Sequence, residues 1–227
     1  MRRRLFDARI PATMTTTPPK SQRYGRNEER LDAAVHILGI LFATYSSLWL
    51  IARIADLSAV AGVAIYCVGL LVMILASAAY QFSRPGRAKE FLRRIDHAAI
   101  FLMIAATYTP FAANRLGHGT GLALLAAIWL CATAGMTLKL VFPGRFERLS
   151  VVFYLVMGWM ILAVAKPLSV ALAPIDFWLL LAGGLVYSAG VGFFLAERLP
   201  FHKPIWHSFV LVAAALQFGA IAGEFAT

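Results

Sequence analysis

The chain of 227 residues is 60% hydrophobic and only 14% charged, which excludes an ordinary soluble domain of this length. Its formal net charge is +10, but the sequence lacks the motifs of nucleic-acid-binding proteins, so no nucleic-acid partner is expected. Successive apolar runs near the roughly 20 residues needed to cross a bilayer, separated by short polar connections, predict an integral membrane protein.

The sequence divides into a polar tail and a membrane bundle. Residues 1–30, which contain TTTPPKSQ, read as a disordered basic tail, and residues 31–227 as one all-α membrane bundle of seven transmembrane helices. Strands of alternating polarity do not give unbroken runs such as GLALLAAIWLCATAGM, so a barrel is not expected. The predicted spans are Ala33–Ile54, Val60–Phe82, Ile95–Asn114, Gly121–Phe142, Leu149–Lys166, Asp176–Ala196 and Pro204–Phe225.

The basic residues predict the orientation of this bundle. Of the 21 Lys and Arg residues, all but Arg53, Arg115 and Lys166 lie in the tail or near the second, fourth and sixth connections. The positive-inside rule therefore places the N-terminus in the cytoplasm and the C-terminus outside, as an odd number of spans requires. We expect the basic face to meet membrane lipids with anionic headgroups.

Polar and ionisable side chains gather near the cytoplasmic ends of several spans. A charge at the centre of a membrane helix costs roughly 3 kcal/mol on insertion scales, so each such residue needs a reason. Residues four apart share a helix face, and three pairs have this spacing. The pairs are Asp32 with His36, Ser77 with Gln81, and Lys203 with His207, and Asp96 and His97 begin the third span.

Two interpretations of this polar set are open. Taken singly, each residue fits an interfacial role, snorkelling or hydrogen bonding between helices. Taken together, their similar depth favours one common chamber at the cytoplasmic side, because chance would scatter them to both ends.

The last span opens with FHKPIWH, whose histidines are His202 and His207. Five residues separate them by about 140° around a helix, so they cannot bind one ion from a regular helix. Pro204 suits the first helical turn and is expected to leave His202 just outside the helix. Lys203 lies one turn before His207, and its ammonium repels a divalent cation unless burial removes its proton.

Six stretches carry a resemblance. They are EERLDAAVHILG, LASAAYQ, RRIDHAAIFLMIAATYTPF, RFERLSVVFYLVMGWMILAVAKPL, LLLAGGLVYSAGVGFF and IWHSFVLVAAALQF. In this order they resemble the hemolysin III branch of the progestin and adipoQ receptor (PAQR) family, over nearly all of the chain from Glu28 on. The resemblance implies seven spans, a bacterial cytoplasmic membrane, and a zinc ion near its inner side.

In that family the resemblance implies zinc held by a histidine of S-x-x-x-H on span two and both histidines of H-x-x-x-H on span seven. A nearby serine and aspartate make the layout similar to that of ceramidases, which suggests hydrolysis of lipid amides. Here Ser77 keeps the serine, but Gln81 stands at the span-two histidine. On span seven His207 keeps the second histidine, Lys203 stands at the first, and Gln217 stands where a further histidine is common.

The first and third of the six stretches keep more of the family's residues than the second and the last do. Glu29 and His36 fit the first motif, with Asp32 in place of its asparagine, and Asp96 fits the aspartate of the third span. A catalytic zinc takes three nitrogen, sulfur or carboxylate ligands, and the amide oxygen of glutamine suits it poorly. We therefore expect the family chemistry to be lost or altered.

A rearranged zinc site is the alternative. In it His207 would bind the ion with partners from one set, Asp96, Asp32, His36 and His97. Ser77 and Asp96 would then be the catalytic side chains. In a second alternative the Lys203 ammonium replaces the ion's charge and pairs with Asp96.

Three functions follow from these alternatives. The first is a lipid-interacting membrane protein whose family site is degraded or altered. The second is a metal-dependent hydrolase of lipid amides or esters with a rearranged site. The third, taken from the family's hemolysin name, is a pore-forming cytolysin, although the uniformly apolar spans lack the polar stripe of a water-filled pore.

Overall fold

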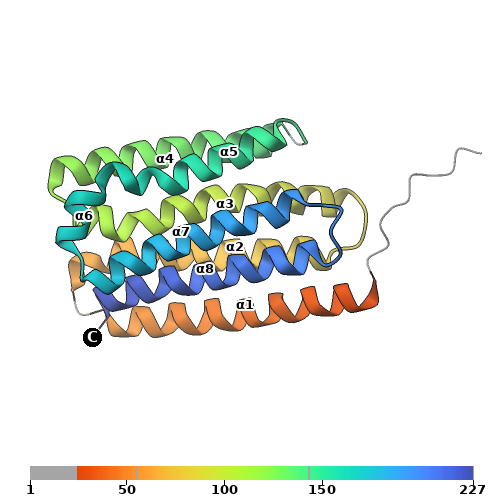
Figure 1. Ribbon diagram of the computed structural model, residues 1–227, viewed down its shortest axis with the longest axis horizontal. Helices are drawn as coiled ribbons and strands as arrows, with labels where there is room; N and C mark the ends of the chain where they lie inside the picture. The colour runs from red at the N-terminus through yellow and green to blue at the C-terminus, as the bar shows by residue number, and fades with distance from the viewer. Residues whose placement is uncertain (1–24, 55, 143, 227) are drawn as a thin grey trace, which may run out of the picture.

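The computed structural model describes residues 25–54, 56–142 and 144–226, which form a bundle of helices aligned along one axis (Figure 1). Seven helical segments of these residues are long and apolar enough to cross a membrane, so the predicted seven-span all-α fold is confirmed. The elements are α1 Arg26–Arg53, η1 Leu57–Ala59, α2 Val60–Phe82, α3 Arg87–Asn114, α4 His118–Val141, α5 Glu147–Gly158, η2 Trp159–Val164, α6 Ala165–Ala171, α7 Pro174–Leu195 and α8 His202–Phe225.

Two helices begin earlier than hydropathy predicted. Helix α1 begins at Arg26, inside the predicted tail, and Glu28 and Glu29 in its first turn complement the helix dipole. Helix α3 begins at Arg87 rather than Ile95, because its first turns are polar and project beyond the apolar span. The rest of the predicted tail, residues 1–24, lies outside the described residues.

Helices α2 and α3 form the centre of the bundle. In the most apolar 18-residue stretch of each of these two spans, 56% and 61% of the residues are buried. The corresponding share in each of the other five spans is at most 33%. Helix α3 packs against α2 and α4, α7 packs against α8, and α1 contacts α2 and α8 (Figure 1). Helices α1, α2, α3 and α8 therefore bring their ends together.

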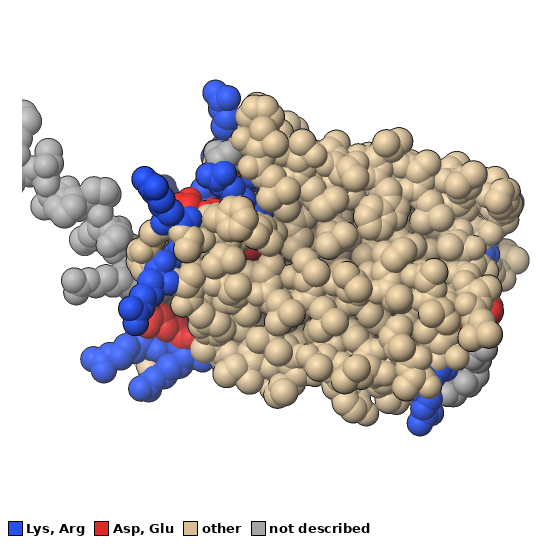
Figure 2. Space-filling model, turned by 180° about the vertical axis from the view of Figure 1, so that it is seen from behind, with Lys and Arg blue, Asp and Glu red and all other residues tan. Residues whose placement is uncertain are grey.

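The outer surface separates an apolar band from a charged end. Large apolar side chains such as Leu41, Leu48 and Trp178 are more than half exposed, as expected for helices that face acyl chains. Figure 2 shows this uncharged band and the Lys, Arg, Asp and Glu side chains gathered mainly at one end. We call this the basic end; α1, α3, α5 and α8 begin there, and α2, α4 and α7 end there.

The fifth span is interrupted, which hydropathy did not predict. Between α5 and α6 the backbone tightens into η2. The Tyr108 hydroxyl donates to the carbonyl oxygens of Met157 and Gly158 (3.1 and 2.7 Å) and accepts from the Ile161 N–H (2.8 Å). Polar backbone groups freed by the break are thus satisfied within the bundle, as hydrocarbon requires.

The end opposite the basic end has its own polar contacts. Arg115 pairs with the Glu224 carboxylate, and its guanidinium lies 4.5 Å from the centre of the Phe225 ring. Asp176, in the first turn of α7, is only 4% exposed. Buried or paired ionisable groups are therefore not confined to the end of the bundle at which the sequence predicted them to gather.

The close contact between α3 and α4 requires a glycine in α4, at position 135. A Cβ built on Gly135 would lie 2.5 Å from atoms of the Phe101 ring, whereas one on Gly192 would meet nothing within 4 Å. Gly135 therefore lets the α4 backbone rest on this aromatic side chain.

We expect Gly135→Ala to lower the melting temperature of the detergent-purified protein, because overpacking a close contact costs about 1–3 kcal/mol. Gly192→Ala is the matched control and should leave the melting temperature unchanged or slightly raised. Thermal unfolding followed by circular dichroism measures both. Equal shifts in the two variants would contradict the contact.

Candidate functional site

A cavity of about 410 Å³ lies at the basic end between α1, α2, α3, α7 and α8, and we call it the chamber. Seven side chains singled out from the sequence line it. They are His36, Ser77, Gln81, Asp96, His97, Lys203 and His207. The structure therefore brings together polar groups from four helices. Glu29 is exposed on α1, and Gln217 lines two cavities nearer the middle of the bundle.

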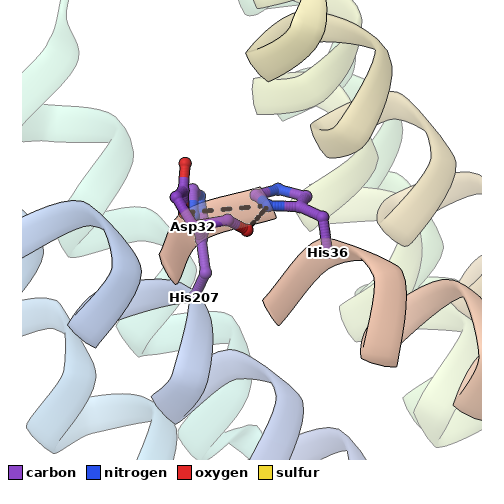
Figure 3. A group of neighbouring side chains, drawn as sticks. All are labelled: Asp32, His36 and His207. Atoms are coloured by element: carbon purple, nitrogen blue, oxygen red, sulfur yellow. Dashed lines mark hydrogen bonds and ion pairs between the residues drawn. The ribbon is translucent and has the colours of Figure 1, made fainter. Parts of the chain in front are cut away.

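Asp32 connects the two central histidines of this site (Figure 3). Its side chain is fully buried, and Oδ1 accepts a hydrogen bond of 2.6 Å from Nδ1 of His207, which comes from α8. The same oxygen lies 3.7 Å from Nδ1 of His36. The other carboxylate oxygen, Oδ2, is buried without a hydrogen-bond partner. A buried carboxylate with one unsatisfied oxygen has room for a further donor or cation.

His36 is held in a defined orientation. Its Nδ1 donates to the main-chain oxygen of Asp32, one turn earlier on α1, over 2.8 Å. In the neutral ring Nε2 is then the acceptor, and it lies 3.2 Å from Oγ of Ser77 on α2. The rings of His36 and His207 meet edge to face, with centroids 4.5 Å apart.

Asp96 is the second carboxylate of the chamber. It comes from α3 and lies in the electrostatic field of His207 and beside Ser77. Lys203 lines the same cavity, and the carboxylate that acts most strongly on its ammonium is that of Asp32. The predicted pair between Lys203 and Asp96 stays a prediction.

The zinc positions of the resemblance do not fit an ion here, because Gln81 and Lys203 are a poor ligand and a cation. A different set does. One ligand atom each from Asp32, His36 and His207 lies within 4.8 Å of the others, and this is the one such group among the described residues. Asp96 and His97, the other partners considered from the sequence, are not in it.

His97 belongs to a neighbouring ionic cluster instead. Its Nδ1 lies 3.7 Å from Glu147, which also pairs with Lys139 at 2.8 Å and with Arg93 at 3.9 Å. Lys139 is 2% exposed on α4, and Glu147 begins α5. This cluster joins α3, α4 and α5 beside the chamber.

Sequence reasoning missed several chamber residues. His202 is the first residue of α8, not outside it, and lines the chamber with Nδ1 buried and unpartnered. Tyr187, Glu197 and Trp206 also line it, from α7, the α7–α8 connection and α8. The hydroxyl of Tyr187 is likewise buried without a partner. Nothing in the spacing of these residues identified them, because the turn of the chain between α7 and α8 decides where they point.

A second, more apolar cavity of about 110 Å³ adjoins the chamber, and we call it the slot. It is lined by residues of α2, α3, α5, η2, α7 and α8, including Tyr154, Trp159 and Gly184. Chamber and slot share five lining residues, Met73, Ile100, Tyr187, Phe194 and Trp206. The polar cavity thus shares a wall with an apolar one within the bundle.

Comparison with known proteins identifies a family. Residues 24–218 match the family described as Haemolysin-III related. The Hemolysin-3 homolog of Bacillus subtilis is 37% identical over 84% of this chain and 91% of its own length. Hemolysin-3 of Bacillus cereus is 38% identical over 84% of this chain and 89% of its own length. The human monocyte to macrophage differentiation factor is 29% identical over 69% of this chain and 67% of its own length. No solved structure matches the chain.

We expect Asp32→Ala to destabilise the purified protein by about 1–3 kcal/mol, because it leaves a buried imidazole N–H of His207 without its acceptor. Asp32→Asn keeps a side-chain oxygen there and should cost clearly less. Glu29→Ala, on the exposed face of α1, is the control and should change stability by no more than about 0.5 kcal/mol. Melting temperatures would show the order; a loss for Glu29→Ala as large as for Asp32→Ala would refute it.

Proposed function

This chain belongs to the haemolysin-III related family, and within that family we propose that it binds a single-chain lipid inside its helix bundle. The polar head of the lipid would occupy the chamber and its acyl chain the slot. The observation that carries the proposal is that the two cavities adjoin and share five lining residues. Their order, polar at the basic end and apolar deeper in the bundle, matches the order of a lipid's parts.

Unsatisfied polar atoms support a ligand in the chamber. The Tyr187 hydroxyl, Nδ1 of His202 and Oδ2 of Asp32 are all buried without a partner. Tyr187 and His202 line the chamber, and Asp32 lies directly behind His207. A buried polar atom without a hydrogen bond costs roughly 1–3 kcal/mol, so a ligand that supplies the missing bonds gains that much at each atom.

The polar head, rather than the chain, would decide which lipid binds. Bilayer tails are as apolar as the slot, so moving an acyl chain from one to the other yields little free energy. The chamber offers both donors and acceptors, including Ser77, Gln81, Lys203 and Asp96. A head with an amide, ester or free carboxyl group can use both kinds.

The location of the protein is part of the proposal. We infer that the basic end faces the cytoplasm, as the positive-inside rule requires, and that it contacts anionic headgroups of a bacterial cytoplasmic membrane. Multi-pass insertion and bacterial homologues support this location. Lipid would then enter the chamber from the inner leaflet.

Hydrolysis of a lipid amide or ester is the second candidate. It is favoured by Ser77 Oγ, 3.2 Å from Nε2 of His36, a geometry in which the histidine can take a hydroxyl proton. In an alternative to this proton transfer, a metal held by Asp32, His36 and His207 would polarise the carbonyl group as a Lewis acid, with Nε2 of His36 as a ligand rather than a base. Cytolysis is the third candidate and rests on the name Hemolysin-3 given to the Bacillus relatives.

A glycine variant that fills the slot tests lipid binding. A Cβ on Gly184, which lines the slot, would be 3.9 Å from the Trp159 ring, so Gly184→Phe places its ring in the slot. We expect this variant to lose the lipid that co-purifies with the wild type, and Gly192→Phe, on the same helix with open space beside it, to keep it. Mass spectrometry of extracted lipids measures both.

The same preparations separate the other candidates. Release of free fatty acid from added N-acyl lipids, lost in Ser77→Ala, would favour hydrolysis. Dye leakage from liposomes containing the pure protein would favour cytolysis. Equal lipid content in the two glycine variants would contradict binding in the slot.

A further inference from the structure

We propose that Asp32, His36 and His207 form a site for a transition-metal ion such as zinc, which shares only His207 with the ligand positions that the resemblance implies. Two of the three ligands come from α1 and one from α8, whereas the positions of the resemblance lie on α2 and α8. The site would therefore be a relocated one, in which α1 supplies what Gln81 and Lys203 no longer can.

The donor set fits such an ion. Two imidazoles and one carboxylate are ligands that zinc takes in proteins, with a position left for an exchangeable ligand. In a tetrahedral site with bonds of about 2.0–2.1 Å, ligand atoms lie roughly 3.3 Å apart. Asp32 Oδ1 lies 2.6 Å from Nδ1 of His207, and with His36 included the three ligand atoms lie within 4.8 Å of one another. Small movements of the side chains would accommodate the ion.

Burial supplies the second, independent argument. Asp32 is fully buried and its Oδ2 has no partner, so its negative charge is only partly compensated by the histidines around it. A divalent cation beside Asp32 would supply the missing positive charge directly. The main-chain oxygen of Asp32 already holds His36 in one orientation, which is the supporting contact that metal-binding imidazoles have in proteins.

Lys203 gives the site a competitor. Its ammonium lies in the field of Asp32 and would weaken cation binding there. We therefore expect Lys203→Met to bind the metal more tightly than the wild type does. A site that used the Lys203 position as a ligand would show the opposite change.

The test uses the full chain, purified in mild detergent with a tag that lacks histidine, and measures bound metal by elemental analysis. The stripped protein is then titrated with Zn²⁺ and with Co²⁺, whose visible absorption reports tetrahedral coordination. We expect about one saturable ion per chain. Asp32→Asn, His36→Gln and His207→Gln should each raise the dissociation constant by more than about 100-fold, beyond what loss of a merely supporting contact causes.

One chamber variant outside the three ligands serves as the control. His97→Gln should bind Co²⁺ as the wild type does, with the same spectrum. Zn²⁺ should raise the melting temperature of the wild type and of this control but not of Asp32→Asn, which separates loss of the site from loss of the fold.

Several results would overturn the proposal. Absence of saturable Co²⁺ binding by the wild type would do so, as would binding that Asp32→Asn leaves intact or that His97→Gln abolishes. The outcome does not depend on lipid binding, since Gly184→Phe fills only the slot and should still bind the metal.

Discussion

The arrangement of this protein depends on one constraint, that a polar side chain inside hydrocarbon must find a partner within the protein. Helix α1 illustrates it: Asp32 and His36 are buried on one face, while Leu41 and Leu48 on another are exposed toward the bilayer. Leaving such a carboxylate among acyl chains would cost several kcal/mol, so the helix has one permitted rotation. The same requirement turns the polar faces of α2, α3 and α8 inward, and they meet at the basic end.

Helix packing decides where the chamber lies, whereas the side chains that line it decide its chemistry. The chamber is built by helix packing around α2 and α3, and Gln81 and Lys203 line it at positions where the resemblance has histidines. The balance of charge in and beside the chamber is more sensitive to such substitutions. Asp32, where the resemblance has an asparagine, adds a buried carboxylate close to two imidazoles, and Lys203 adds an ammonium in its field. The proposed lipid head, the proposed metal ion and the Lys203 ammonium would thus all act on one group of atoms.

Much of the fold could be predicted because the length and apolar character of each span are local properties of the chain. The grouping of Ser77, Asp96 and His207 was also predictable, since residues four apart share a face and buried polar groups must meet. What sequence could not give depends on tertiary geometry. The break at Trp159–Val164 is satisfied by Tyr108 of α3, and His202 belongs to α8 because that helix starts two residues earlier than the predicted start at Pro204. Which carboxylate, Asp32 or Asp96, joins the histidines was equally a matter of distances.

Accessibility of single cysteines tests most directly whether the polar groups share a chamber at the basic end. In a background lacking Cys67 and Cys131, Ser77→Cys should react with a membrane-impermeant thiol reagent added from the side of the basic end. Ser46→Cys, on α1 and 1% exposed, should not react. An unreactive Ser77→Cys, or equal reaction at both positions, would contradict the account.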